Sequence, residues 1–345
     1  MALGRYVHCA LPARGRPNAE FAGVDVGGTK IAAAVLRAGE LVDHAIQPTD
    51  GDDAEALIAE IVASVEEIRT AATAAVGVGV PSVIEWETGR ARASVNVPLT
   101  DVPLRRVLGE RLGLPVFVDN DATLAALAEA HDGDRLVSRN LVMLTVGTGV
   151  GGGLVLDGHP YRGATGAAAE IGHTLIGVEL DGDAVPAPTR FPQTGSLERF
   201  AAGSVLDVLA RAAADEHPDS YLGERAAAGE EVDGTDAVAG AKAGDAVAAR
   251  AVELLGERLG LGIANAINTF DPEVVAIGGG VSSAGELLVG PARRTALRYV
   301  LPGVGERTEI RLSVHGPKAG VLGAALLAKL ELERSTERKD DDGRD

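Results

Sequence analysis

The stretch Asp25-Val26-Gly27-Gly28-Thr29-Lys30 is the first of three glycine-rich turns in this chain. The second is Thr145-Val146-Gly147-Thr148-Gly149-Val150-Gly151-Gly152-Gly153, and the third is Ile277-Gly278-Gly279-Gly280. Each turn follows a short apolar run that predicts a β-strand, namely Phe21–Val26, Leu141–Val146 and Val274–Ile277. Turns without bulky side chains let backbone N–H groups approach a large anion closely. We therefore expect the first two turns to bind phosphates and the third to bind the rest of a nucleotide.

Composition and charge exclude several classes of protein. Of the 345 residues, 46% are apolar and only 3% aromatic, which predicts a globular protein with an aliphatic core. The net charge of −18 repels nucleic acids and anionic membranes, so we expect neither as a partner. A single cysteine, Cys9, allows no internal disulfide, and no apolar run is long enough for a transmembrane helix. Residues 1–20 lack the apolar region of a signal peptide, so we expect a cytoplasmic protein.

Hydrophobic periodicity predicts two successive α/β units, and therefore a bilobal α/β protein with a cleft between the lobes. The polar, glycine-rich stretch His217–Gly244 is expected to be a mostly exposed connection with some helix. The other predicted helices are Asp53–Ala71, Leu104–Leu112, Ala122–Ala130, Val205–Ala214, Val247–Asn268 and Gly320–Leu332, and the other strands include Ala75–Val80, Val116–Val118, Gly153–Leu156 and Ile310–Val314.

Taken alone, each glycine turn is better explained as a tight hairpin bend. Gly147-x-Gly149-x-x-Gly152 matches the dinucleotide-binding fingerprint, but that fingerprint requires a helix after it. In this chain Leu154-Val155-Leu156 predicts another strand, which argues against a dehydrogenase. The chain also has no Walker A sequence. Three such turns at strand ends nevertheless favour an ATP-dependent enzyme.

Six segments in fixed order resemble the ROK family of sugar kinases and repressors, which has the two-lobed hexokinase/actin-like ATPase (ribonuclease H-like) fold. They are Asp25–Lys30, Asn120-Asp121-Ala122, Gly147–Gly153, Glu170-Ile171-Gly172-His173, Gly195-Ser196-Leu197-Glu198 and Asp271–Gly280, within residues 21–330. With this fold we expect a flexible arm (1–20), a small N-terminal lobe (21–121) and a large C-terminal lobe (122–317), then a helix (318–334) that packs back on the N-terminal lobe, and a disordered tail (335–345).

The resemblance makes Asp121 the general base, which takes the proton from the sugar hydroxyl as that oxygen attacks the γ-phosphorus of ATP. Asn120 and Asp121 also stand between a predicted strand and a predicted helix, where both residue types are preferred N-caps. The two roles are compatible because the positive end of a helix keeps a carboxylate ionised. Asp119 lies nearby, and only the family pattern favours Asp121 over it.

The resemblance also implies how sugar, nucleotide and metal are bound. Asn120, Glu170, His173 and Glu198 would hydrogen-bond sugar hydroxyls, and Ser82 would lie next to the sugar, where the family often has Gly. Asp25 would act on Mg²⁺ through water, although it can also be a turn residue, and Lys30 can equally be a solvated strand residue. The implied nucleotide-binding residues are Asp25, Gly27, Gly28, Thr29, Lys30, Gly147, Thr148, Gly149, Gly278, Gly279 and Gly280.

The chain departs from the family pattern at a zinc site. Many members hold structural zinc with a His and the cysteines of C-x-C-G-x-x-G-C-x-E. The corresponding positions in this chain are Thr189, Phe191 and Ser196, none of which supplies a thiolate. We therefore expect no structural zinc, and packing around Phe191 and Pro192 in its place.

The leading hypothesis is an ATP- and Mg²⁺-dependent hexose kinase, a glucokinase, that phosphorylates the sugar 6-hydroxyl. A repressor of the same family is disfavoured, because the 24 residues before Asp25 leave no room for a helix-turn-helix. A non-catalytic sugar sensor is disfavoured because Asp121 and Asp25 are both present. N-acetylmannosamine, N-acetylglucosamine, fructose and mannose stay open as substrates, and polyphosphate as donor. The resemblance implies a homodimer.

Overall fold

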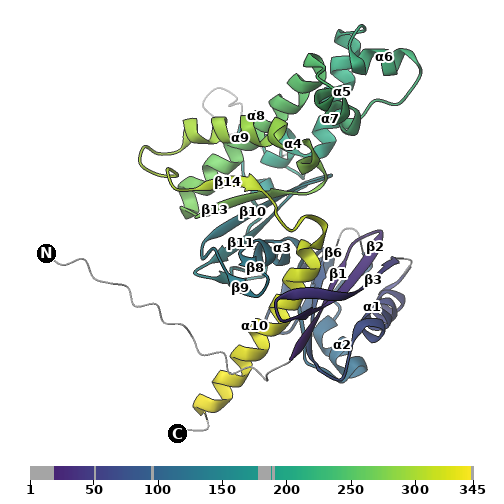
Figure 1. Ribbon diagram of the computed structural model, residues 1–345, viewed down its shortest axis with the longest axis vertical. Helices are drawn as coiled ribbons and strands as arrows, with labels where there is room; N and C mark the ends of the chain where they lie inside the picture. Colours follow the sequence, from purple (N-terminus) through teal and green to yellow (C-terminus); the bar gives the residue numbers. More distant parts are fainter. Residues whose placement is uncertain (1–18, 50–51, 95–96, 178–187, 189–190, 343–345) are drawn as a thin grey trace, which may run out of the picture.

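The computed structural model describes residues 19–49, 52–94, 97–177, 188 and 191–342. Its framework is two five-stranded sheets with the same connectivity (Figure 1). The N-terminal sheet has the order β3-β2-β1-β4-β7, and the C-terminal sheet has the order β12-β11-β10-β13-β14. In each, the first two pairings are antiparallel and the last two parallel. This repetition confirms the predicted two-lobed α/β fold.

The strand positions agree closely with the expected ones. The N-terminal sheet consists of β1 (Glu20–Val26), β2 (Lys30–Arg37), β3 (Glu40–Pro48), β4 (Thr73–Val80) and β7 (Val116–Asn120). The C-terminal sheet consists of β10 (Leu141–Val146), β11 (Val150–Leu156), β12 (His159–Pro160), β13 (Val274–Gly278) and β14 (Glu309–Leu312). Two small hairpins, β5 (Ser82–Glu85) with β6 (Arg90–Ser94) and β8 (His131–Asp132) with β9 (Arg135–Leu136), were not expected.

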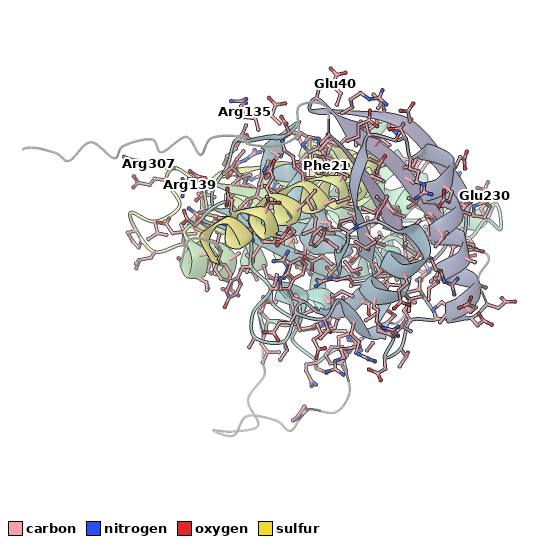
Figure 2. The ribbon with its side chains drawn as sticks, turned by 90° about the horizontal axis from the view of Figure 1, so that it is seen from below. Phe21, Glu40, Arg135, Arg139, Glu230 and Arg307 are labelled. Atoms are coloured by element: carbon pink, nitrogen blue, oxygen red, sulfur yellow. The ribbon has the colours of Figure 1, made fainter. Side chains whose placement is uncertain are left out.

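Two helices fill the space between the sheets. Helix α3 (Asp121–Glu129) packs on β10 and β11, helix α10 (Ala319–Asp342) packs on β1 and β4, and the two helices contact each other (Figure 1). Their apolar residues share one buried cluster with residues of both sheets, including Phe21 of β1, which lies beside α10 in Figure 2. By contrast, charged side chains such as Glu40, Arg135 and Glu230 extend outward (Figure 2). The junction between the lobes is therefore a packed apolar layer.

The outer faces carry the remaining helices. Helices α1 (Ala54–Ile68) and α2 (Leu104–Leu112) cover the N-terminal sheet, and Asp53 caps α1 as its residue type predicts. The C-terminal lobe has α4 (Leu197–Ala201), α5 (Gly203–Glu216), α6 (Tyr221–Ala227), α7 (Gly234–Lys242), α8 (Ala246–Phe270), α9 (Glu286–Tyr299) and the 3₁₀ turns η1 (Ile171–His173), η2 (Gly280–Ala284) and η3 (Gly316–Lys318). Within the described part of the chain, no helix has both the length and the apolar character that crossing a bilayer requires.

The prediction of some helix in the largely exposed stretch His217–Gly244 is confirmed, but the stretch is more than a connection. This stretch forms α6 and α7, and Leu222 and Ala237 are fully buried in the core of the C-terminal lobe. Its small residues make this packing work: a Cβ on Gly240 would lie 2.6 Å from the Tyr221 ring. Alanine and glycine carry little hydrophobic signal, so the burial of these helices was not visible in the pattern.

The two chain ends also differ from the expectation. Residues 1–18 of the expected arm lie outside the described residues, but Glu20 already belongs to β1. The structure differs from the expected disorder from Ser335 in that α10 continues to Asp342; residues 343–345 lie outside the described residues. Glutamate, lysine and arginine are good helix formers, and the helix needs no apolar face where it projects past the sheets.

Candidate functional site

Strand β7 ends at Asn120, and helix α3 begins at the next residue, Asp121. The Asn120 side-chain oxygen is the N-cap and accepts hydrogen bonds from the N–H groups of Ala122 (2.9 Å) and Thr123 (3.2 Å). The Asp121 carboxylate also accepts from Ala122 N–H, at 2.9 Å. Both residues thus cap the helix, and its positive end stabilises the Asp121 carboxylate. A capping role of this kind is compatible with a second role for the Asp121 carboxylate.

Asp119 has a different environment from Asp121. It is 3% exposed, and its Oδ2 accepts a hydrogen bond from Arg162 Nε at 2.6 Å. Its Oδ1 accepts from the backbone N–H of Asn120 at 2.9 Å. Both oxygens are occupied, so Asp119 is not available as a base. The two neighbouring aspartates thus differ in environment, because Asp119 is tied to protein groups through both of its oxygens.

Asp25, near the end of β1, is close enough to Asp121 for their charges to interact. Burial and the charge of Asp121 raise the pKa of Asp25 to about 6, against the opposing charge of Lys30. Burial likewise raises the pKa of Asp121, while the Ala122 N–H opposes the rise. A Cβ on Gly320 would lie 2.3 Å from Asp25 Oδ2, so the carboxylate lies against the first turn of α10. Two carboxylates from different elements therefore interact at this point.

The first two glycine turns are tight hairpin loops. Val26 pairs with Ile31, and Gly27 N–H donates to the Lys30 carbonyl at 2.9 Å, leaving Gly28, Thr29 and Lys30 exposed. Val146 pairs with Val150, so the second loop is Gly147-Thr148-Gly149, held by a 2.9 Å bond from Gly147 N–H to the Gly149 carbonyl. Both turns thus have the hairpin geometry that each predicts in isolation, which leaves phosphate binding as a prediction.

The remaining glycines of the second motif lie in β11 rather than in the turn, so this strand begins at Val150 and not at Gly153. They permit close packing on both faces of the strand. A Cβ on Gly152 would lie 2.2 Å from the Ala169 carbonyl, and one on Gly153 would lie 2.3 Å from the Ala122 carbonyl. The glycines therefore bring the segment before Glu170 and the start of α3 against the same strand.

The third turn lies against the second. Gly279 has a φ of 86°, a left-handed conformation that favours glycine, and a Cβ there would lie 2.4 Å from the Val146 carbonyl. Gly278 and Gly280 flank it at the end of β13, and the space around Gly280 is open. The parallel pairing of β10 with β13 thus brings the second and third turns together at one edge of the sheet.

The predicted sugar-binding residues gather around β11. His173 Nε2 lies 3.6 Å from Glu170 Oε2 across η1, and the His173 ring contacts Phe191 with centroids 4.4 Å apart. Glu198, in α4, accepts a hydrogen bond from Val150 N–H at 2.8 Å. A Cβ on Gly149 would lie 2.3 Å from the Glu198 carboxylate. Glu198 therefore lies directly against the second glycine turn.

Ser82 is buried at the start of β5. Its hydroxyl donates to the Ala93 carbonyl at 2.8 Å, within the β5–β6 hairpin. Its own carbonyl accepts from Asn120 Nδ2 at 3.5 Å. The structure therefore places Ser82 next to Asn120, with its hydroxyl proton already used by the hairpin.

The sequence profile of the ROK family matches residues 21–331. This chain belongs to the ROK family. A glucokinase of Halalkalibacterium halodurans is 38% identical, over 92% of this chain and 97% of the relative. A glucokinase of Thermotoga maritima is 33% identical, over 91% and 98%. The solved ROK family glucokinase from Streptomyces griseus, in complex with glucose and AMPPNP, has a TM-score of 0.73 and 31% identity, covering 90% of this chain and 99% of that one.

Two residues of this ROK chain, Arg162 and Trp86, lie beside the Asp119–Asp121 segment and were not predicted from the sequence. Arg162 forms the ion pair with Asp119, and Trp86 lies against the Arg162 guanidinium, 3.4 Å from ring centroid to Cζ. Arg162 lies in no recognisable motif, and only the tertiary structure brings it to Asp119. Trp86 is the single tryptophan of the chain, which distinguishes it in composition but does not indicate its position.

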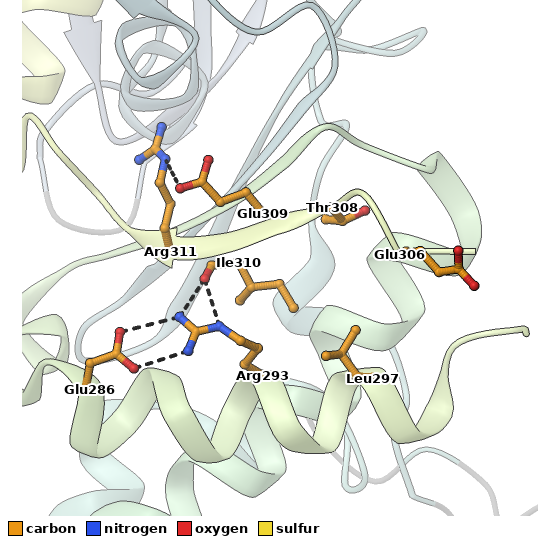
Figure 3. A pocket seen from close by; sticks show the side chains of 9 residues that line it. Glu286, Arg293, Leu297, Glu306, Thr308, Glu309, Ile310 and Arg311 are labelled. Carbon is orange, nitrogen blue, oxygen red and sulfur yellow. Dashed lines mark hydrogen bonds and ion pairs between the residues drawn. The ribbon is translucent and has the colours of Figure 1, made fainter. Parts of the chain in front are cut away.

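A cavity of about 680 Å³ lies elsewhere in the ROK fold, between α9 and the edge strand β14 (Figure 3). Arg293 donates to the Ile310 carbonyl and pairs with Glu286, and Arg311 pairs with Glu309 and Glu129. The arginines that line the cavity are thus paired with protein groups. The cavity lining includes no residue of the three glycine turns. This cavity is therefore not the candidate active site.

Proposed function

We infer that this chain is an ATP-dependent glucokinase, which transfers the γ-phosphoryl group of ATP to the 6-hydroxyl of glucose. The observation that carries this conclusion is the lobe junction, where Asp121 and Asp25 meet at the positive end of α3. Similarity to glucokinases over nearly the whole chain supports glucose as the acceptor and ATP as the donor. The product would enter sugar catabolism in the cytoplasm.

In the proposed reaction Asp121 accepts the proton of the sugar 6-hydroxyl. The freed oxygen attacks the γ-phosphorus, the bond to the β–γ bridging oxygen breaks, and ADP leaves. Burial raises the pKa of Asp121, which makes its carboxylate a better proton acceptor. The backbone N–H of Ala122 and the helix end oppose this rise, because they stabilise the charged form of the carboxylate.

We propose that Asn120, Glu170, His173, Glu198 and the backbone of Ser82 hold the sugar. Carboxylates suit this role because they accept hydrogen bonds from two neighbouring hydroxyls. The phosphates would meet the first two turns, with N–H donors from Gly28, Thr29, Thr148 and Gly149 and the charge of Lys30. Gly27 and Gly147, whose own N–H groups are used within the turns, would shape them. The nucleoside would lie along Gly278, Gly279 and Gly280.

Asp25 is the residue proposed to hold Mg²⁺, with Asp121 nearby. The assignment of Mg²⁺ to Asp25 is supported by the pKa of this carboxyl group. Burial and a second carboxylate raise it to about 6, as expected for an acid that lacks sufficient countercharge. The described residues contain no group of three or more His, Cys, Asp or Glu able to hold a metal, which suits an ion bound mainly by phosphate oxygens and water. Bound Mg²⁺ would neutralise charge on the transferred phosphoryl group.

A coupled assay of ADP release across a sugar panel, with ATP and polyphosphate as donors, tests the proposal. We expect glucose to be the best acceptor, ATP the better donor, and turnover to require Mg²⁺. Asp121→Ala should lower kcat about 10³-fold or more while the protein stays folded. Asp132→Ala is the matched control, since Asp132 is exposed and pairs only with Arg135 within the described structure. An Asp121→Ala enzyme with normal turnover would exclude Asp121 as the base.

We propose that packing replaces the structural zinc of other ROK proteins. Phe191, at a former zinc-ligand position, contacts the His173 ring, whereas Thr189 lies outside the described residues. Elemental analysis of the purified protein should find well under one zinc per chain. A stoichiometric zinc content would overturn this proposal.

We also propose a homodimer, which light scattering after size exclusion would detect.

A further inference from the structure

Arg162 crosses from one lobe to the other. It follows β12 of the C-terminal sheet and begins the segment that leads to Glu170. Its side chain is only 11% exposed and reaches Asp119 of β7, in the N-terminal sheet, where Nε lies 2.6 Å from Oδ2. The Asp119 side chain is 4% exposed, so this is a buried ion pair between the lobes. Pairs of this kind are costly to break, because the partner is left as an uncompensated buried charge.

The same guanidinium contacts two further elements. Its plane stacks on Trp86, which follows β5, and its Nη2 lies 3.7 Å from Glu331 Oε1 of α10. A planar, delocalised cation suits these simultaneous stacking and ion-pair contacts, which a lysine ammonium would not reproduce. Arg162 therefore joins its own loop to β7, to the β5–β6 hairpin and to α10.

The segment after Arg162 is itself tied to the N-terminal lobe. Ala168 N–H donates to the Arg162 carbonyl at 3.1 Å, which closes the loop that precedes Glu170. Gly166 packs on β5 so closely that a Cβ would lie 1.8 Å from the Ile84 carbonyl. The sugar-binding segment and the catalytic segment are thus in contact through Arg162 and its loop.

We propose that Arg162 is a positioning residue for phosphoryl transfer, which holds the Asn120–Asp121 segment in place through Asp119. This inference rests on the proposed function. The guanidinium fixes Asp119 Oδ2, and Asp119 Oδ1 fixes the backbone N–H of Asn120, the residue directly before the base. Arg162 touches neither reacting group, so its effect reaches the chemistry only through the orientation of Asp121 relative to the sugar bound by the Glu170 segment.

Arg105 provides a matched control. It is a second arginine at the same tryptophan, with Cζ 5.0 Å from the Trp86 centroid, and it donates to the backbone carbonyls of Trp86 and Glu87. Within the described structure it makes no hydrogen bond to Asp119. Both arginines place positive charge near Asp119, but only Arg162 hydrogen-bonds it. A general requirement for packing or charge at Trp86 would therefore affect both arginine variants, whereas the positioning proposed here requires the hydrogen bond from Arg162.

Steady-state kinetics of the full-length enzyme with glucose and ATP test this proposal. We expect Arg162→Met to lower kcat about 10–100-fold, the loss typical of a small misplacement at a reacting centre, with the KM for ATP unchanged. Arg162→Lys should recover part of that loss, and Arg105→Met should stay within about twofold of the wild type. Normal kcat in Arg162→Met, or equal losses in both Met variants, would overturn the proposal.

A double-mutant cycle adds a second readout. Asp119→Asn keeps the acceptor for Asn120 N–H but loses the charge, so the Asp119→Asn/Arg162→Met enzyme should be no slower than the worse single variant. Losses in kcat that multiply would mean that the two residues act independently, against the proposal. If Arg162→Met does not fold, Arg162→Lys and Asp119→Asn form the cycle instead. A wild-type enzyme inactive on every sugar would refute the proposed function itself. The kcat ratios between variants test only the positioning role of Arg162.

Discussion

At the scale of single residues, Asp25 and Asp121 bring two like charges into a poorly solvated site. Burial is the main cause that raises the pKa of each, and for Asp25 the value reaches about 6 from an ordinary 3.8. The folded state thus binds the Asp25 proton more tightly than the unfolded state does. The contribution of Asp25 to stability is greatest below pH 3.8 and is lost as the pH rises through about 6.

Asp25→Asn should therefore stabilise the apo protein at neutral pH while abolishing kinase activity. A shift of about two pKa units corresponds to about 1–3 kcal/mol, and the neutral amide also relieves the repulsion of Asp121. Urea denaturation with EDTA and without ATP, at about pH 7.5 and about pH 3.5, measures the gain and its expected disappearance in acid. Asp132→Asn at an exposed site should change little. Equal or lower stability of the Asp25→Asn protein at neutral pH would show that burial and repulsion do not destabilise the Asp25 carboxylate.

At the scale of elements, α10 approaches the N-terminal sheet more closely than side chains would allow. A Cβ on Gly23 of β1 would lie 2.2 Å from the Val321 carbonyl, and one on Gly77 of β4 would lie 1.8 Å from the Ala324 carbonyl. On the other face of the helix, a Cβ on Gly323 would lie 1.9 Å from the Leu124 carbonyl of α3. Backbone on both sides leaves no flexible neighbour that can move aside.

Gly77→Ala should therefore destabilise the protein by about 3 kcal/mol or more, because α10 or β4 must shift. Gly109→Ala is the contrasting control. Gly109 lies inside α2, where a Cβ meets nothing closer than 3.6 Å, and alanine should stabilise the helix by about 0.5–1 kcal/mol. Thermal unfolding of both variants measures opposite signs for the same chemical change. A Gly77→Ala protein as stable as the wild type would show that the junction can relax.

At the scale of the whole molecule, the chain passes between the lobes twice, once through α3 and once between β14 and α10. Glu129 connects these two segments. It is at the end of α3, and its fully buried carboxylate accepts bonds from Arg311 and Ser313, each 2.6 Å away, and from the N–H groups of Val314 and His315, each at 3.0 Å. These last residues lead the chain from β14 back to α10. Burial opposes ionisation, but these donors outweigh it and lower the pKa of Glu129.

Glu129→Gln should cost about 2–4 kcal/mol at neutral pH, because Arg311 and the backbone donors lose their shared charged partner. The lowered pKa means that this contribution is present above the ordinary value of 4.5 and is lost as the pH falls through the folded value. Melting temperature against pH should therefore fall less steeply in acid for the variant than for the wild type. Glu309→Gln is the control, since Glu309 is 65% exposed and lies 4.0 Å from the same arginine. Parallel pH profiles of wild type and Glu129→Gln would contradict the assignment.

The sequence by itself determined the local structure of this protein. The strands before the three glycine turns, helix α2, the N-cap at Asn120 and the long helix α8 follow from periodicity and residue preference, which act over a few neighbouring positions. The order of six motifs was also enough to identify the ROK family, which the profile match confirms. Helix α9 was not predicted from the sequence, because its arginines and Pro291 obscure the apolar repeat.

Only the tertiary structure decided which of two neighbouring carboxylates forms a buried ion pair. Asp119 and Asp121 are equivalent in sequence preference, and they differ because Arg162, distant along the chain, pairs with Asp119. The placement of α10 between the sheets depends in the same way on glycines that carry no side-chain signal. Contacts between distant segments depend on three-dimensional packing, and a pattern that reports only on near neighbours does not contain them.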